Sequence, residues 1–236
     1  MPNPLAEAEE FLWRGRTGPL TLRLVPGVFR PTSTSMALAE ALEISSGDVV
    51  IDAGCGSGVL SFVAARLGAE RVYGCDLSQV SVDLAQENAR LLGLEDRTEF
   101  RQGDLFVPLQ DVEADVVIGD VSGIPDELAE LTGWFPGGPT GAELPIKMLE
   151  GSRERLKPGG RFYLPTGSIQ DESSVLAAAR RLFEQINPVV EREFPLPGLV
   201  AQSKEVARLM KEGWLSLRQR GSRWLWKLTV WRCESP

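Results

Sequence analysis

The stretch Val49-Val50-Ile51-Asp52-Ala53-Gly54-Cys55-Gly56-Ser57-Gly58 decides the fold of this 236-residue chain. Its first three residues are β-branched, which is typical of a strand buried on both faces of a parallel sheet. The three glycines lack a Cβ, so the backbone can turn sharply there and lie close to a ligand. Helix-forming residues follow from Val59 to Leu67, and the N–H groups at the start of that helix face the turn. This order of strand, turn and helix predicts a nucleotide-binding α/β fold.

The spacing of the glycines separates two classes of cofactor. A dinucleotide-binding turn has the pattern G-x-G-x-x-G or G-x-G-x-x-A, and counting from Gly54 places Val59 at its third glycine, which disfavours a NAD-dependent oxidoreductase. The pattern present, G-x-G-x-G with an acid two residues earlier, resembles motif I of the class I S-adenosylmethionine-dependent methyltransferases. In that family the acid lies near the ammonium group of the cofactor. The resemblance implies that the cofactor-binding residues include Asp52, Gly54, Cys55, Gly56 and Gly58.

Acidic residues also end the three strands predicted at 71–75, 99–102 and 115–119. Parallel strands end at a common edge, so we expect Asp52, Asp76, Asp104 and Asp120 to line one rim of the sheet. Asp76 follows Gly58 by eighteen residues and can accept hydrogen bonds from ribose hydroxyls. The resemblance places Asp104 at the adenine amino group. We therefore expect an adenosine site that also includes Leu77 and Leu105, with ordinary turn aspartates as the alternative.

The resemblance spans residues 25 to 186 and is closest to the subgroup of release-factor glutamine methyltransferases and other small-domain N-methyltransferases. Three segments carry it: a loop at 26–31 before Thr32, the glycine-bearing stretch 137–144, and Leu-Lys-Pro-Gly-Gly-Arg-Phe-Tyr-Leu at 156–164. In the subgroup such a loop covers the cofactor, so Thr32 joins the expected cofactor-binding residues. We divide the chain into an N-terminal extension with this loop, residues 1–45, and a methyltransferase domain, residues 46–236.

The chain departs from this subgroup at the catalytic motif. Where the subgroup has N-P-P-Y or D-P-P-Y, this sequence has Asp120-Val121-Ser122-Gly123-Ile124-Pro125. Asp120 is retained, and we expect it to bind the hydrogens of an acceptor nitrogen or to lie in the cofactor pocket. The stacking tyrosine is missing. Trp134 and Phe135, in a Gly/Pro-rich stretch, are candidates to replace its ring, and ordinary packing is the alternative for them.

Composition restricts the chemistry. The chain has no histidine, which excludes a Ser-His-Asp triad, a histidine-ligated metal and a histidine base. Its cysteines, Cys55, Cys75 and Cys233, form no C-x-x-C pair, so we expect neither a metal nor a disulfide framework. With 43% hydrophobic residues, no long apolar run and no signal-peptide pattern, the sequence favours a cytoplasmic protein with no membrane segment.

We predict a Rossmann-like seven-stranded sheet with helices on both faces and a C-terminal antiparallel hairpin. The hairpin pairs residues 214–218 with 223–233 around a turn at 219–222, and Trp224, Trp226, Leu228 and Val230 share one face of its second strand. Aromatic stacking on a nucleic acid is the alternative role for that face. Residues 194–198 read as a loop, and residues 1–10 read as an irregular terminus.

Charge is distributed unevenly along the chain. The net charge is −8, but residues 11–39 carry +4 and residues 204–232 carry +6, whereas residues 40–203 carry −14. Basic ends of this kind are usually a solvated surface, and an acidic or RNA-associated acceptor is the alternative. We predict an enzyme that moves a methyl group from S-adenosylmethionine to an N (or O) nucleophile of a protein or small-molecule acceptor. Two alternatives stay open: a non-catalytic S-adenosylmethionine-binding scaffold or sensor, and a methyltransferase with an RNA- or ribosome-associated acceptor.

Overall fold

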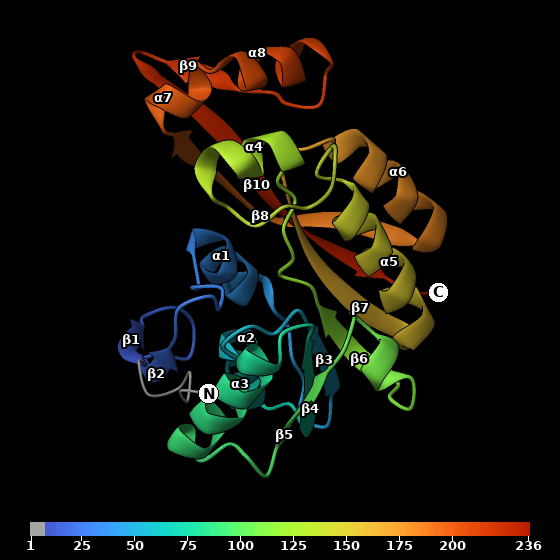
Figure 1. The fold of residues 1–236 in the computed structure, drawn as a ribbon. Helices are drawn as coiled ribbons and strands as arrows, with labels where there is room; N and C mark the ends of the chain where they lie inside the picture. The colour runs from blue at the N-terminus through green and yellow to red at the C-terminus, as the bar shows by residue number, and fades with distance from the viewer. Residues whose placement is uncertain (1–7) are drawn as a thin grey trace.

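Strands of five or six residues, most of them apolar at their centre, form the parallel half of the central sheet in the computed structural model, which describes residues 8–236. These strands are β3 (Val49–Ala53), β4 (Arg71–Asp76), β5 (Thr98–Gln102) and β6 (Ala114–Ile118), and the longer β7 (Leu156–Gly167) continues the sheet. The full order is β5-β4-β3-β6-β7-β10-β8 (Figure 1). The sheet therefore has seven strands along its path, which confirms the predicted fold class.

Helices cover both faces because consecutive residues of the central strands are apolar and point to opposite sides. Val50 packs with α1 (Ser33–Ala41), α2 (Val59–Leu67) and α3 (Gln79–Leu92). Its neighbour Ile51 packs with α5 (Glu143–Arg155) and α6 (Glu172–Leu182) on the other face. Leu109 of the 3-10 helix Val107–Leu109 packs in the same apolar cluster as Ile51. None of these helices, nor any other among residues 8–236, combines the length and the apolar character that a bilayer crossing requires.

The glycine turn leads into α2 as the sequence predicts. Gly58 has a φ of +86°, and a Cβ at this position would come within 2.7 Å of the Phe62 ring. Both facts favour glycine, because an L side chain there is strained and has no space. The next helix, α3, begins after Ser78, whose hydroxyl accepts from the Ser81 N–H, and ends at Gly93 in the left-handed conformation.

The N-terminal segment corrects one prediction. Of the expected irregular terminus, residues 1–7 lie outside the described residues, but Glu9–Trp13 forms strand β1, which pairs with β2 (Leu20–Leu24). The strand forms because Trp13 is completely buried in the core beside α1 and α2. The edge of β2 is tied to α3, since the Arg23 N–H donates to Asn88 Oδ1 at 2.7 Å and Asn88 Nδ2 donates to the Arg23 carbonyl at 3.0 Å.

The C-terminal region contains the predicted antiparallel pairing, with different bounds. Strand β10 (Arg223–Glu234) lies between β7 and β8 (Gln185–Leu196) and is antiparallel to both. Because Leu196 pairs with Trp224, residues 194–196 belong to β8 and are not a loop as expected. The first hairpin strand is only β9 (Arg218–Arg220); residues 214–217 leave the strand because Leu215 is buried in a third apolar cluster.

That third cluster joins the C-terminal region to the edge of the sheet where the parallel strands end. Two helices between β8 and β9, α7 (Gly198–Ala201) and α8 (Lys204–Lys211), pack with α4 (Asp126–Thr132), which follows β6. Figure 1 shows α4 between these C-terminal elements and α1. The cluster members Val206, Leu209 and Leu128 are fully buried. The C-terminal elements are thus attached beside the carboxyl end of β6.

Candidate active site

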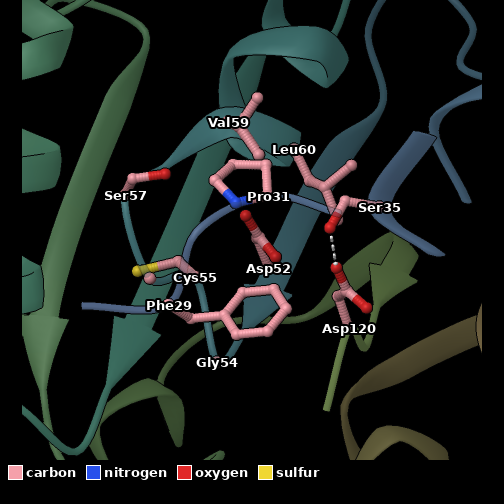
Figure 2. Close-up of a pocket in the computed structure, with 11 residues that line it drawn as sticks. Phe29, Pro31, Ser35, Asp52, Gly54, Cys55, Ser57, Val59, Leu60 and Asp120 are labelled. Carbon is pink, nitrogen blue, oxygen red and sulfur yellow. Dashed lines mark hydrogen bonds between the residues drawn. The ribbon is translucent and has the colours of Figure 1, made fainter. Parts of the chain in front are cut away.

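A narrow cavity opens where β3 and β6 end, at the start of α2 (Figure 2). The glycine turn, the two strand-end aspartates and the segment before α1 all contribute to it, so three parts of the chain close around one space. Its lining consists of Phe29, Pro31, Ser35, Asp52, Gly54, Cys55, Gly56, Ser57, Val59, Leu60 and Asp120.

Asp52 is the most deeply buried charged group of this cavity, with 1% of its surface exposed. Its Oδ2 accepts a hydrogen bond from the Ser61 hydroxyl at 2.6 Å, while its buried Oδ1 has no partner among the described residues. Burial raises the pKa of Asp52 to about 7, the Ser61 hydrogen bond opposes this, and the charge of Asp120 adds to it. A buried carboxylate oxygen without a donor is costly. A cationic ligand that donates hydrogen bonds would satisfy Oδ1.

Asp120 faces the same cavity from the end of β6 (Figure 2). Its Oδ2 accepts a hydrogen bond from the Ser35 hydroxyl on α1 at 2.6 Å. Burial raises the pKa of Asp120 to about 6, and the Ser35 hydrogen bond lowers it in part. Two carboxyl groups with raised pKa values in one small cavity form a site that gains from binding positive charge.

Asp76 is fixed in place by backbone donors at the end of β4. Its Oδ2 accepts from the Gly56 N–H at 3.0 Å and its Oδ1 accepts from the Ser78 N–H at 2.9 Å. The turn is held to the same strand because the N–H groups of Gly54 and Cys55 both donate to the Cys75 carbonyl. Asp76 therefore presents its remaining lone pairs in a rigid orientation beside the glycine turn.

The other predicted adenosine residues lie on an open rim outside the narrow cavity. Leu77 is 72% exposed, and Asp104 is exposed after the end of β5. Leu105 is half-buried with a φ of +46°, and the Cys75 thiol donates to its carbonyl at 2.7 Å. The ends of β4 and β5 thus form one exposed shelf, which suits a flat, partly polar ligand group. The shelf consists of Asp76, Leu77, Asp104 and Leu105.

Three more predicted residues take other positions. Gly58 is the residue before α2 and does not line the cavity. Thr32 is the N-cap of α1 and is exposed; its hydroxyl accepts from the Thr34 N–H at 3.2 Å. Trp134 is 39% exposed after α4 and does not line the cavity, and its N–H donates to the Thr132 hydroxyl. The cavity itself collects Asp52, Gly54, Cys55, Gly56 and Asp120 from the predicted set.

An aromatic pair lies at the cavity, and the sequence indicated only one of its members, Phe135. The Phe29 ring lies over it (Figure 2) and meets the Phe135 ring edge-to-face, with the centroids 6.0 Å apart. Phe135 is 53% exposed. Sequence analysis also missed Ser35 and Ser61, the two hydroxyl donors to the aspartates. Ser61 had a usable signal, a polar residue inside the apolar helix Val-Leu-Ser-Phe-Val-Ala-Ala; Ser35 had none apart from its place in a helix start.

The loop at 120–125, which follows β6, is held by a second loop at 135–141. The Gly137 N–H donates to the Ile124 carbonyl at 2.7 Å, and the Asp126 N–H donates to the Gly138 carbonyl at 3.0 Å. The backbones of the two loops come into contact because glycines, which lack a Cβ, lie at the points of contact. A Cβ on Gly137 would lie 2.4 Å from the Ser122 carbonyl oxygen. Backbone hydrogen bonds and close glycine contacts therefore hold the loop at 120–125 in place.

Gln170 supports the same loop from the side of β7. It is 5% exposed, and its Oε1 accepts from the Gly167 N–H at 3.1 Å. A Cβ on Gly123 would lie 2.0 Å from that oxygen, so the loop and the glutamine amide are in direct contact. Gly123 is needed for this approach, which the sequence alone did not indicate.

Sequence comparison finds relatives among methyltransferases. Residues 26–131 match the protein-family model described as ribosomal protein L11 methyltransferase (PrmA). A ribosomal protein L11 methyltransferase of Caldanaerobacter subterraneus is 31% identical over 185 residues, which are 76% of this chain and 53% of the relative. A release factor glutamine methyltransferase of Moorella thermoacetica is 32% identical over 168 residues, 65% of this chain and 59% of the relative. The chain spans about half the length of these curated relatives.

Solved structures agree on the architecture. A T. thermophilus 16S rRNA N2 G1207 methyltransferase, in complex with AdoMet and guanosine, superposes with a TM-score of 0.65 over 97% of this chain and 51% of its own length, at 19% identity. The fold is that of the class I methyltransferases. A ribosomal protein L11 methylase of Lactobacillus delbrueckii gives a TM-score of 0.58 at 18% identity, over 91% of this chain and 86% of its own. This chain is a homologue of methyltransferase enzymes, which confirms the predicted resemblance to methyltransferases. The departure of residues 120–125 from the motif of the subgroup stays a prediction.

Proposed function

We propose that this chain transfers a methyl group from S-adenosylmethionine to an acceptor nitrogen, with oxygen as the second candidate atom, on a protein or small molecule. The observation that carries the proposal is the unpaired, buried Oδ1 of Asp52 beside a glycine turn. An amino-acid ammonium group is positively charged and donates hydrogen bonds, and so meets both needs of that oxygen. Among the matched relatives, methyltransferases for proteins support a protein acceptor.

The residues present fit S-adenosylmethionine in three parts. Asp52 and the turn at 54–58 would hold the methionine end in the narrow cavity. Asp76 would accept the ribose hydroxyls, since it is fixed by Gly56 and Ser78. Asp104, with Leu77 and Leu105, would bind adenine on the exposed shelf. When bound, this cofactor supplies a methyl group already activated on a sulfonium, so the protein's main task is to align and desolvate the reactants.

Asp120 is the proposed acceptor-binding residue. Its carboxyl group lies in the same cavity as Asp52 and is oriented by Ser35. There it would accept a hydrogen bond from the acceptor N–H and stabilise the positive charge that develops on nitrogen. With a pKa of about 6, it can also take up the proton that the acceptor releases. Alignment of this kind accounts for roughly 7 to 11 kcal/mol of barrier reduction in well-oriented reactions.

The ring that covers the acceptor is proposed to be Phe29 with Phe135, because Phe29 lines the cavity and Phe135 contacts the Phe29 ring. Trp134 stays a candidate for the same role. Matched variants separate them: Phe135→Ala should reduce turnover more than Trp134→Ala. The opposite order would assign the role to Trp134.

Two measurements test the proposal. S-adenosylhomocysteine should raise the midpoint of thermal unfolding and NAD should not; protection by NAD alone would refute it. The purified protein with labelled S-adenosylmethionine and a cell extract should then label a protein or small molecule that mass spectrometry can identify. A cofactor that binds while nothing becomes labelled would favour the scaffold or sensor, and labelled RNA would favour the RNA acceptor.

A further inference from the structure

The C-terminal strands extend past the edge of the sheet that holds the site. The last residue of β7, Gly167, pairs with Leu228, so the first five residues of β10, Arg223–Lys227, continue beyond that end. At about 3.4 Å per residue they reach roughly 17 Å further. The end of β8 and the short β9 pair with this overhang. Strands β8, β9 and β10 together form a projection, which lies above α4 in Figure 1.

Positive charge concentrates at the tip of this projection, which we call the basic ribbon and define as residues 218–227. Arg218, Arg220 and Arg223 are exposed, and the Gly221 turn between the last two has a φ of +60°. Arg218 pairs with Glu193, but within residues 8–236 no carboxylate forms an ion pair with Arg220 or Arg223. The exposed Lys211 at the end of α8 is likewise without an ion pair in that part of the chain.

The register makes this charge costly for the isolated chain. Arg220 and Arg223 are directly opposite each other in the β9–β10 pairing. Like charges in that position destabilise a hairpin. The chain is rich in acids, with 33 Asp and Glu residues against 25 Lys and Arg, yet none neutralises this pair among the described residues. An anionic ligand would remove the repulsion and use both guanidinium groups.

Helices α8 and α4 lie between the basic ribbon and the cavity, and Trp224 of the ribbon packs in one cluster with Leu209 of α8 and Leu128 of α4. On α8, Arg208 forms an ion pair with Glu127 of α4, so the two helices are in contact. After α4 ends, the exposed rings of Trp134 and Phe135 follow, and Phe135 touches Phe29 over the cavity. The acidic first turn of α4, Asp126 and Glu127, lies between the arginines and these rings, and Glu127 neutralises Arg208. Free arginines and exposed aromatic rings on one molecule are the combination that binds single-stranded nucleic acid.

We propose that the basic ribbon is a docking surface for the phosphate backbone of single-stranded RNA, with bases stacking on the exposed rings beside the cavity. RNA is the expected ligand rather than DNA, because the single-stranded nucleic acid that is abundant in cells is RNA. The role of the surface rests on the proposed function, since it would bring a protein acceptor that is bound to RNA to Asp120. RNA binding itself does not depend on methyl transfer.

The test is the salt dependence of RNA binding by the full chain. A fluorescent single-stranded RNA of mixed sequence is titrated at several salt concentrations with wild-type protein and with the double variant Arg220→Gln, Arg223→Gln. The matched control, Arg180→Gln, Arg181→Gln, changes the net charge equally in the last turn of α6, away from the basic ribbon. An oligo-glutamate peptide is the competing anion. Thermal unfolding verifies that both variants fold.

Removal of two phosphate contacts should make the slope of log K against log salt shallower by about 1.4, and should weaken binding about tenfold near 0.15 M salt. The α6 control should keep the wild-type slope. Equal weakening in both variants, no RNA binding at low salt, or a preference for the peptide would overturn the proposal. S-adenosylhomocysteine binding is measured on the same samples. A protein that binds RNA but not S-adenosylhomocysteine would refute the proposed function alone. A protein that binds S-adenosylhomocysteine but not RNA would refute the docking surface alone.

Discussion

Binding of S-adenosylhomocysteine should become tighter as pH rises from about 5.5 to about 7.5. The cause is Asp52, whose pKa is raised to about 7 mainly by burial. The ligand's ammonium group stays charged over this range and needs the ionised carboxylate. At low pH the site is occupied by a proton that must leave before the ligand binds, and this competition weakens the observed affinity.

The size of the effect follows from the fraction of Asp52 that is ionised. A pKa of about 7 gives roughly 3% ionised at pH 5.5 and roughly 76% at pH 7.5. The association constant should therefore rise roughly 25-fold, or about 2 kcal/mol. Below the pKa, binding must also release a proton, about 0.9 per ligand at pH 6.

Isothermal titration calorimetry measures both quantities. Affinity is determined across the pH range, and proton release is determined at one pH in buffers with different ionisation enthalpies. The variant Asp52→Asn keeps the side-chain shape and lacks the titrating group, so its affinity should be low and nearly independent of pH. Adenosine, which lacks the ammonium group, is the matched ligand control and should show no rise.

A flat affinity profile for the wild type, or binding without proton release at pH 6, would refute this reasoning. It would mean that Oδ1 of Asp52 does not meet the ligand's ammonium group. A rise of equal size for adenosine would transfer the effect to another group, such as Asp120. A rise that survives in Asp52→Asn would do the same.

Three further predictions concern the strand-end acids and the acceptor loop. Asp120→Ala should reduce turnover at least tenfold while the affinity for S-adenosylhomocysteine stays within about threefold; equal losses would place Asp120 in the cofactor pocket. The contribution of Asp52 to the stability of the free protein should fall as pH rises: the folded pKa of Asp52, about 7, lies above the usual value of 3.8, so the folded state holds this proton longer. This contribution, on the order of 4 kcal/mol, is present below about pH 4 and is lost as pH rises through 7. Denaturant unfolding of the wild type and of Asp52→Asn at several pH values measures it. The same change of unfolding free energy with pH in both proteins would contradict it. Gly123→Ala places a Cβ against Gln170 and should cost about 1 to 3 kcal/mol of unfolding free energy, while Gly198→Ala, with open space around it, should cost less than 1; similar losses in the two variants would show that the contact with Gln170 is unimportant.

The sequence by itself determined the central α/β unit. The strand at 49–53, the glycine turn and the helix Val59–Leu67 are set by neighbours along the chain: β-branched residues, glycines at positive φ and helix-forming residues. Ser78 and Gly93 likewise mark the ends of the next helix. The rim of aspartates follows from the same information, because parallel strands joined by helices must end at one edge. Local preferences and this topological rule were sufficient for both.

Only the tertiary structure decided which side chains meet inside the site. Ser35 reaches Asp120 across 85 positions of the chain, and Phe29 meets Phe135 across a still longer stretch of sequence. The strand at 9–13 forms because Trp13 is buried by helices that follow it in the sequence. The overhang of β10 depends on a register against β7 and β8 that is set by packing on both faces. Such contacts join segments whose separate sequences carry no record of one another, so their geometry is fixed only when the whole core packs.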